Sequence, residues 1–309
     1  MKRRTKILLT LGGILVAAGL ASALAGLAMA DFRLENLSTQ APARRQELAY
    51  DAGEVAEIRL EAAADDVRVE PSEDGRIHLA LNQREARPYD VELEDGVLTV
   101  RPEAGGTSRL IWFGFHSGAS TPLVLSLPAD FSGDLAVGSD LGEVALRDVS
   151  AGVVMVSADA GAVAVTNLRA SQLTATVSMG DLEGSGWRID GAAAVAFDAG
   201  EVALRDVTAA DLRCTVNLGD IRLERVTADS VSVAVEAGET VLDHLRADEI
   251  ELESDLGDIR GTIEGREEAY TIQTETDLGE SSLPDRVGTS GRTLTAYADT
   301  GDIDLRFTD

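Results

Sequence analysis

The sequence predicts an all-β protein, a single-stranded parallel β-helix (β-solenoid) with rungs of about 19 residues, preceded by an N-terminal hydrophobic helix. Three observations predict this fold: a recurring short sequence, an even spacing of its copies, and a period of two in the apolar residues. SDLGEVALRDV at 139–149 returns as FDAGEVALRDV at 197–207 and, more loosely, as VNLGDIRLERV at 216–226. A fixed period indicates stacked repeats that bury their apolar faces only against neighbouring repeats.

The spacing is carried by one glycine in each repeat. Successive glycines are 19, 19, 20, 19, 19, 19, 22 and 22 residues apart: Gly142, Gly161, Gly180, Gly200, Gly219, Gly238, Gly257, Gly279 and Gly301. In LRCTVNLGDIRL the apolar residues alternate with polar ones on both sides of the glycine, which predicts strand, turn and strand. We expect each rung to pair with the next along its whole length, so that nine rungs at about 4.8 Å form a rod of about 43 Å.

Two columns of residues are expected to face the core. Seven positions before the glycines stand Leu135, Val154, Leu173, Ala193, Leu212, Val231, Ile250, Ile272 and Leu294. Two positions after them stand Val144, Val163, Leu182, Val202, Ile221, Thr240, Ile259, Ser281 and Ile303. The two polar members, Thr240 and Ser281, suggest looser packing at their rungs.

The glycines themselves are expected at tight corners with a positive φ. A phosphate-binding loop is disfavoured because such loops precede a helix, and no rung contains one. The residue before the glycine alternates between large and small: Leu141, Ala160, Met179, Ala199, Leu218, Ala237 and Leu256.

The N-terminal segment, residues 1–31, is expected to enter a membrane. Ile7 to Ala30 are 24 positions without a charge, and they follow Lys2, Arg3, Arg4 and Lys6, so the amino end should stay in the cytoplasm. The length favours an uncleaved anchor, whereas ALAMA before Asp31 offers a signal-peptide cleavage site. The expected protein is therefore a single-pass cell membrane protein with a periplasmic or extracellular C-terminal region, or else a protein secreted after cleavage.

The rest of the chain divides into three parts. Residues 32–50 read as a linker, 51–131 as a strand-rich N-terminal section or cap, and 132–309 as the β-helix repeats. Between them, residues 108–120 concentrate Trp112, Phe113 and Phe115. This segment is expected to close the open end of the β-helix, or alternatively to project as a partner-binding loop.

Composition restricts the function. The 309 residues hold 54 acidic and 27 basic side chains, and the net charge of −27 makes nucleic acid an improbable partner. No lysine follows Lys6, which excludes Schiff-base chemistry from the exported part. Cys214 lies in an inward column and is expected to be a buried small apolar residue, and His78, His116 and His244 match no zinc spacing. We therefore predict no catalytic, cofactor-binding or metal-binding residue.

The motifs SDLGDIRG and ADTGDIDL resemble those of the bacterial "putative adhesin" family with β-strand repeats, domain of unknown function 4097. The resemblance covers roughly residues 50–309. It implies a parallel β-helix and a cell-envelope location, and no established activity. Relatives of this kind are sometimes associated with envelope-stress systems.

The predicted function is a non-enzymatic surface binding, adhesion or scaffold module with an unknown envelope protein or glycan as partner and no cofactor. The alternative is a polysaccharide-processing β-helix enzyme that uses outward carboxylates such as Asp255, Asp258, Asp299 and Asp302. We favour the binding module because similar acids recur at nearly every rung.

Acidic residues form two rows beside the glycines. Fifteen of the eighteen positions that lie two before or one after a glycine are acidic. The rows are expected to be a solvated edge that serves the turns, or to bind divalent cations such as calcium weakly.

Overall fold

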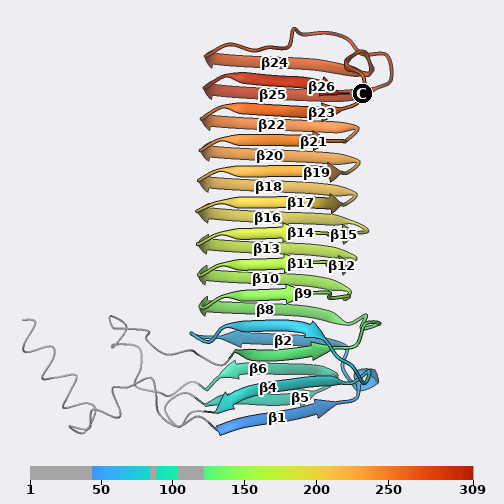
Figure 1. Cartoon of the computed structure of the whole chain (residues 1–309), viewed down its shortest axis with the longest axis vertical. Helices are drawn as coiled ribbons and strands as arrows, with labels where there is room; N and C mark the ends of the chain where they lie inside the picture. Colours follow the sequence, from blue (N-terminus) through green and yellow to red (C-terminus); the bar gives the residue numbers. More distant parts are fainter. Residues whose placement is uncertain (1–43, 84–87, 104–121, 309) are drawn as a thin grey trace, which may run out of the picture.

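The computed structural model describes residues 44–83, 88–103 and 122–308, and these form a β-solenoid of stacked rungs (Figure 1). A typical rung has a long strand, a sharp turn at the glycine, a short strand, and a second turn that leads to the next rung. In one rung β10 (Val153–Ala160) precedes Gly161, and β11 (Val163–Thr166) precedes Asn167. The predicted strand, turn and strand are therefore confirmed.

The rungs stack into two sheets whose inner faces enclose the core. The long strands of the repeats are parallel members of a 12-stranded sheet: β8 (Asp134–Leu141), β10, β13 (Gln172–Met179), β16 (Ala192–Ala199), β18 (Asp211–Leu218), β20 (Ser230–Ala237), β22 (Glu249–Leu256), β24 (Tyr270–Leu278) and β25 (Arg292–Thr300). The second sheet contains β9 (Val144–Arg147), β11, β14 (Leu182–Ser185), β17 (Val202–Thr208), β19 (Ile221–Thr227), β21 (Thr240–Leu245), β23 (Ile259–Glu264), β26 (Ile303–Thr308) and the short β12 (Arg169–Ala170) and β15 (Arg188–Ile189).

The core contains both expected columns. Every residue of the column before the glycine is buried, and Cys214 stacks between Val195 and Val233 as expected. Thr240 is only 1% exposed, and looser packing at its rung stays a prediction. Ser281 is half-buried and lies near the end of the stack.

One rung of the core is built differently from its neighbours. Trp187 is fully buried, and its indole N–H donates to the Val165 carbonyl at 2.9 Å. Gly184 stands where the adjacent rungs have Val165 and Leu204, and a Cβ there would lie 2.3 Å from the Trp187 ring. The missing side chain therefore makes the space that the large indole fills.

The glycine corner is the column of turns at the repeat glycines. Eight of the nine glycines have φ between 137° and 151°: Gly142, Gly161, Gly180, Gly200, Gly219, Gly238, Gly257 and Gly301. A Cβ on Gly219 would lie 1.7 Å from the Gly200 carbonyl oxygen of the rung below. Positive φ and the close approach of the neighbouring backbone both require glycine, so the predicted corner is confirmed.

The strand-rich N-terminal section continues both sheets. β2 (Glu57–Ala62) pairs in parallel with β8, and β3 (Val67–Pro71) pairs in parallel with β9. Beyond this rung lie β6 (Val97–Pro102) and β7 (Leu123–Leu127), followed by the antiparallel β5 (Tyr89–Glu94), β4 (Ile77–Gln83) and β1 (Arg44–Tyr50). β1 occupies the last seven residues of the expected linker, and a short 3₁₀ helix follows it at Ala52–Glu54.

The C-terminal rungs do not stack in chain order. β25 pairs directly with β22, and β24, which precedes β25 in the sequence, lies outside it at the end of the stack (Figure 1). The order of the stacked glycines is therefore Gly257, Gly301 and Gly279. This corrects the expectation that each rung pairs with the next, and its cause is a crossing through the 3₁₀ helix Glu267–Ala269 and a return loop. In that loop Arg286 forms two backbone hydrogen bonds with Ile272.

Several expectations concern residues outside the described ranges. These are the hydrophobic segment 1–31, the aromatic segment 108–120 with Trp112, Phe113 and Phe115, and His116. Within the described ranges no helix has the length and apolar character needed to cross a membrane.

Candidate functional site

The aspartates that follow the corner glycines are part of the turn. Asp220 accepts a hydrogen bond from the Glu239 backbone N–H of the next rung at 2.8 Å. Equivalent bonds join Asp181 to Glu201, Asp258 to Asp302, and Asp302 to Glu280. Asp66, which follows Asp65 and not a glycine, accepts the same bond from Glu143. The glutamates of this row make no such bond to the next rung among the described residues, which fits their side chains being one methylene longer.

This role bears on the carboxylates that the enzyme alternative would use. The Asp258 and Asp302 carboxylates each accept a backbone N–H at 2.9 Å. Asp255 and Asp299 lie on paired strands at equivalent positions and are exposed. All four therefore stand at positions that repeat along the stack, and none of them lines the arginine-rich pocket described below.

The remaining sequence candidates are separate from one another. Burial raises the pKa of the Cys214 thiol to about 12, so the side chain stays a neutral thiol. His78 lies 2.7 Å from Asp74, and His244 lies 2.7 Å from Asp243, both on the exposed surface. In the described part of the chain, no three His, Cys, Asp or Glu side chains are placed to hold a metal ion. Weak calcium binding between the acidic rows stays a prediction.

An apolar ridge runs along the glycine corner. Its members are the large residues that directly precede the corner glycines, and four of them are more than half exposed: Met179, Leu218, Leu256 and Leu278 at 59%, 59%, 56% and 69%. Between them lie the small residues Ala199, Ala237 and Thr300. The order in space is therefore large, small, large throughout, and Thr300 maintains the alternation only because the last two rungs are exchanged.

The alternation of large and small residues is matched by an alternation of aspartate and glutamate in the adjacent acidic row. Met179, Leu218 and Leu256 share a turn with Asp181, Asp220 and Asp258, whereas Ala199 and Ala237 share one with Glu201 and Glu239. Each of these aspartates accepts a hydrogen bond from a backbone N–H of the next rung in the stack, so each joins its own rung to the next at this corner. The large side chains are thus held about 9.6 Å apart, or two strand spacings.

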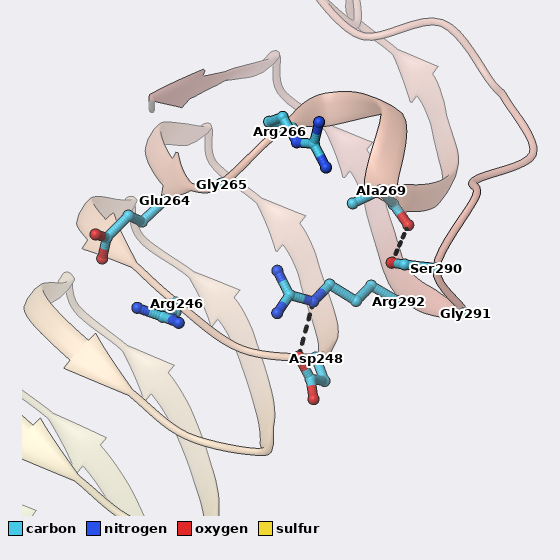
Figure 2. Close-up of a pocket in the computed structure, with 9 residues that line it drawn as sticks. All are labelled: Arg246, Asp248, Glu264, Gly265, Arg266, Ala269, Ser290, Gly291 and Arg292. Atoms are coloured by element: carbon cyan, nitrogen blue, oxygen red, sulfur yellow. Dashed lines mark hydrogen bonds and ion pairs between the residues drawn. The ribbon is translucent and has the colours of Figure 1, made fainter.

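A second candidate site, the arginine pocket, lies at the C-terminal end of the stack. Figure 2 shows Arg266 on one side of a hollow, Arg292 reaching across it, and Arg246 on the rung below. The cavity measures about 720 Å³ and is also lined by Asp248, Glu264 and Ser290. It forms where the chain leaves the stack after β23 and returns before β25.

Sequence reasoning missed this pocket. The available signal was the change of glycine spacing from 19 to 22 residues at Gly257, because a longer repeat must add a loop. The exchange of the last two rungs then brings Arg292 next to Asp248, 44 residues earlier in the chain, at 2.8 Å. The periodic pattern contains no information about that exchange.

A family model described as Toastrack DUF4097 matches residues 55–306. The chain belongs to the Toastrack family. The expected family is thereby confirmed, and the match spans both the strand-rich section and the repeats. No curated protein matches the chain.

Several solved structures are similar to this Toastrack chain. A protein from Parabacteroides distasonis described as a "putative lipid binding protein" is 14% identical with a TM-score of 0.51, and the match covers 86% of this chain and 97% of that one. A "putative adhesin" from Bacteroides fragilis is 11% identical with a TM-score of 0.45, covering 86% and 99%. Another "putative adhesin", from Parabacteroides merdae, is 14% identical with a TM-score of 0.37, covering 86% and 96%. The likeness to the Parabacteroides distasonis protein shows a common fold only.

Proposed function

We propose that this Toastrack protein is a non-enzymatic binding or scaffold module, anchored in a membrane by its N-terminal segment, with the β-solenoid outside the cytoplasm. The proposed location rests on the uncharged run Ile7 to Ala30 and the basic residues before it. The names of the structural neighbours, adhesins and a lipid-binding protein, are compatible with binding. A link to envelope stress stays part of the proposal through family resemblance alone.

The apolar ridge is the observation that supports a binding role most directly. A row of exposed apolar side chains is typical of a surface that a partner covers. Here the row is regular, because Met179, Leu218 and Leu256 repeat every second rung. A catalytic site would need a local departure from the repeat at this edge, and the ridge instead extends the repeat.

The surroundings of the ridge define the chemistry of the partner. Asp198, Glu236 and Asp255 flank it on one side, and Asp220 and Asp258 on the other, and all five are exposed. A partner that covers the ridge must place apolar side chains on it and basic side chains beside it. We therefore propose a protein partner with a basic, apolar surface segment.

Site-specific photocrosslinking in intact source cells tests this function. A photoreactive residue at Leu218 should give a discrete protein adduct, and the same residue at Thr215, exposed on the same strand, should not. Adding Leu256→Ser should reduce the Leu218 adduct severalfold, because it removes the next large side chain of the ridge. Absence of an adduct from Leu218, or equal adducts from both positions, would contradict the proposal.

Fractionation tests the anchor independently. The full chain should stay in the membrane fraction after a high-salt wash, since the anchor is hydrophobic and salt weakens only electrostatic attachment. Release of a mature species that begins at Asp31 would instead support signal cleavage and secretion.

A further inference from the structure

We propose that the arginine pocket binds a small sugar acid through its carboxylate. This site lies at the end of the stack, away from the apolar ridge, and the inference does not depend on the proposed partner. It is carried by the position of Arg292, by the two arginines beside it, and by the size and polarity of the cavity.

Arg292 is held in place from three sides. Its Nε lies 2.8 Å from an Asp248 carboxylate oxygen, and its guanidinium carbon lies 5.6 Å from the centre of the Tyr270 ring. A Cβ on Gly265 would lie 3.6 Å from an Arg292 terminal nitrogen, so the backbone passes close to the guanidinium. Tyr270 is itself fixed, because its hydroxyl donates to the Ala247 carbonyl at 2.7 Å. The pocket therefore presents a pre-positioned cation.

Arg246 and Arg266 add positive charge without a partner. Both are exposed, and neither forms an ion pair with any residue that the structure describes. Three guanidinium groups thus line the pocket with two carboxylates, Asp248 and Glu264, and Asp248 is already engaged by Arg292. Figure 2 shows the Glu264 carboxylate at the outer edge of the site, turned away from Arg292. In a chain of net charge −27, this is a local excess of one positive charge.

The cavity selects the kind of anion. About 720 Å³ lies within the usual range for small-ligand pockets and admits a mono- or disaccharide. Apart from Ala269 and two glycines, the lining residues have charged or polar side chains, which suits a hydroxyl-rich ligand better than an apolar one. Guanidinium groups bind carboxylates through two parallel hydrogen bonds, and the Ser290 hydroxyl and the Glu264 carboxylate can accept from sugar hydroxyls.

The field of the whole molecule limits the ligand further. A strongly negative protein repels polyanions over distances longer than the pocket. A ligand with one isolated carboxylate matches the local excess of one positive charge and feels less repulsion from the rest of the protein than a polyanion does. This combination favours a single uronate residue over a highly charged polymer.

Isothermal titration of the full-length chain in non-ionic detergent tests the inference. D-glucuronate should bind with a stoichiometry of one, and D-glucose and inorganic phosphate, at matched ionic strength, should bind at least about tenfold more weakly. Arg246→Gln and Arg266→Gln should each weaken glucuronate binding by about tenfold, the loss of one charge-assisted hydrogen bond. Arg222→Gln, which changes an exposed arginine on the middle of the stack, should leave it unchanged.

Each other result would overturn the inference. Absence of glucuronate binding would contradict the inference. Equal binding of phosphate and glucuronate would show that the pocket attracts anions in general. Equal binding of glucose would show that the carboxylate has no role. Equal losses of glucuronate affinity for Arg222→Gln and Arg246→Gln would show that the net charge of the protein, and not the pocket, determines binding. Because Arg246 and Arg266 form no ion pair in the described structure, their variants keep the fold, which circular dichroism and an unchanged melting temperature would verify.

Discussion

The two corners of each rung have the same sign of φ and opposite tolerance for side chains. At the glycine corner φ lies between 137° and 151° for eight of the nine glycines, and every repeat has glycine. At the second corner, after the short strand, φ lies between 53° and 68°, and the residues differ: Asp148, Asn167, Gly186, Asp206, Arg225 and His244. The sign of φ alone therefore does not decide which residue a corner accepts.

The difference comes from what lies against each corner. A Cβ at the glycine corner would meet a carbonyl oxygen of the stacked turn, at 1.7 Å for Gly219. At the second corner the side chains reach one another instead. Asn167 donates to Asp148 at 2.7 Å, and Arg225 pairs with Asp206 at 2.6 Å and lowers the pKa of that carboxyl. The first corner is limited by backbone contact, and the second is open to surface interactions.

The largest expected effect is at the glycine corner. Gly219→Ala should lower the free energy of unfolding by more than about 3 kcal/mol, because the Cβ overlaps the Gly200 carbonyl and φ is unfavourable. Gly75→Ala is the matched control, since its φ is also positive but its Cβ would meet nothing within 4 Å. It should cost only about 1 kcal/mol. Urea denaturation measures both, and similar losses would contradict the steric explanation.

A smaller effect is expected from the acidic row at the same corner. Asp220→Ala should cost about 1 kcal/mol, since it removes the hydrogen bond to the Glu239 backbone N–H. Glu201→Ala changes the equivalent residue of the preceding rung and should cost close to zero, because Glu201 makes no such bond. Thermal unfolding monitored by circular dichroism compares the pair. A larger loss for Glu201→Ala would mean that the row acts through charge.

The smallest expected effect, and one of opposite sign, is at the second corner. His244→Gly should raise the free energy of unfolding by about 0.5 kcal/mol, because relief of the left-handed backbone exceeds the added flexibility of glycine. Gly186→Ala makes the reverse change in the same column and should lower the free energy of unfolding, both because of its positive φ and because its Cβ would lie 2.5 Å from the Asn167 side-chain oxygen. If His244→Gly destabilises the protein, the surface contact with Asp243 matters more than the backbone strain.

Sequence periodicity predicts the regular part of this molecule well because each rung obeys the same local constraint. The corner is predicted by the repeated glycines, such as Gly200 and Gly219. The core is predicted by the apolar columns that contain Leu212 and Ile221. The second corner was not predicted, because Asp206, Arg225 and His244 share no side-chain type that marks a positive φ. The burial of Trp187 is not predicted by the repeat either, because its indole fits only where Gly184 in the same rung leaves space.

The arginine pocket could not be predicted from the repeat. Arg246, Arg266 and Arg292 are 20 and 26 residues apart, and nothing in the local pattern indicates that they line one cavity. Their proximity follows from the insertion of β25 between β22 and β24. Because β24 and β25 have similar local sequences, the local pattern does not indicate which of them pairs with β22. Long-range pairing of this kind depends on contacts throughout the end of the stack. One of these is the contact between Tyr270 and Phe307, whose ring centroids are 5.1 Å apart.

The exchanged rungs also impose an order of events on folding. A chain that emerges amino end first delivers β24 before β25, yet β24 pairs only with β25 in the finished sheet. At ribosomal rates of about 5–20 residues per second, the start of β25 follows the start of β24, 22 residues earlier, by about 1 to 4 s. During that interval β22 presents a free edge that β24 can occupy. Docking of β24 against β22 would then have to be reversed before β25 takes its place between them.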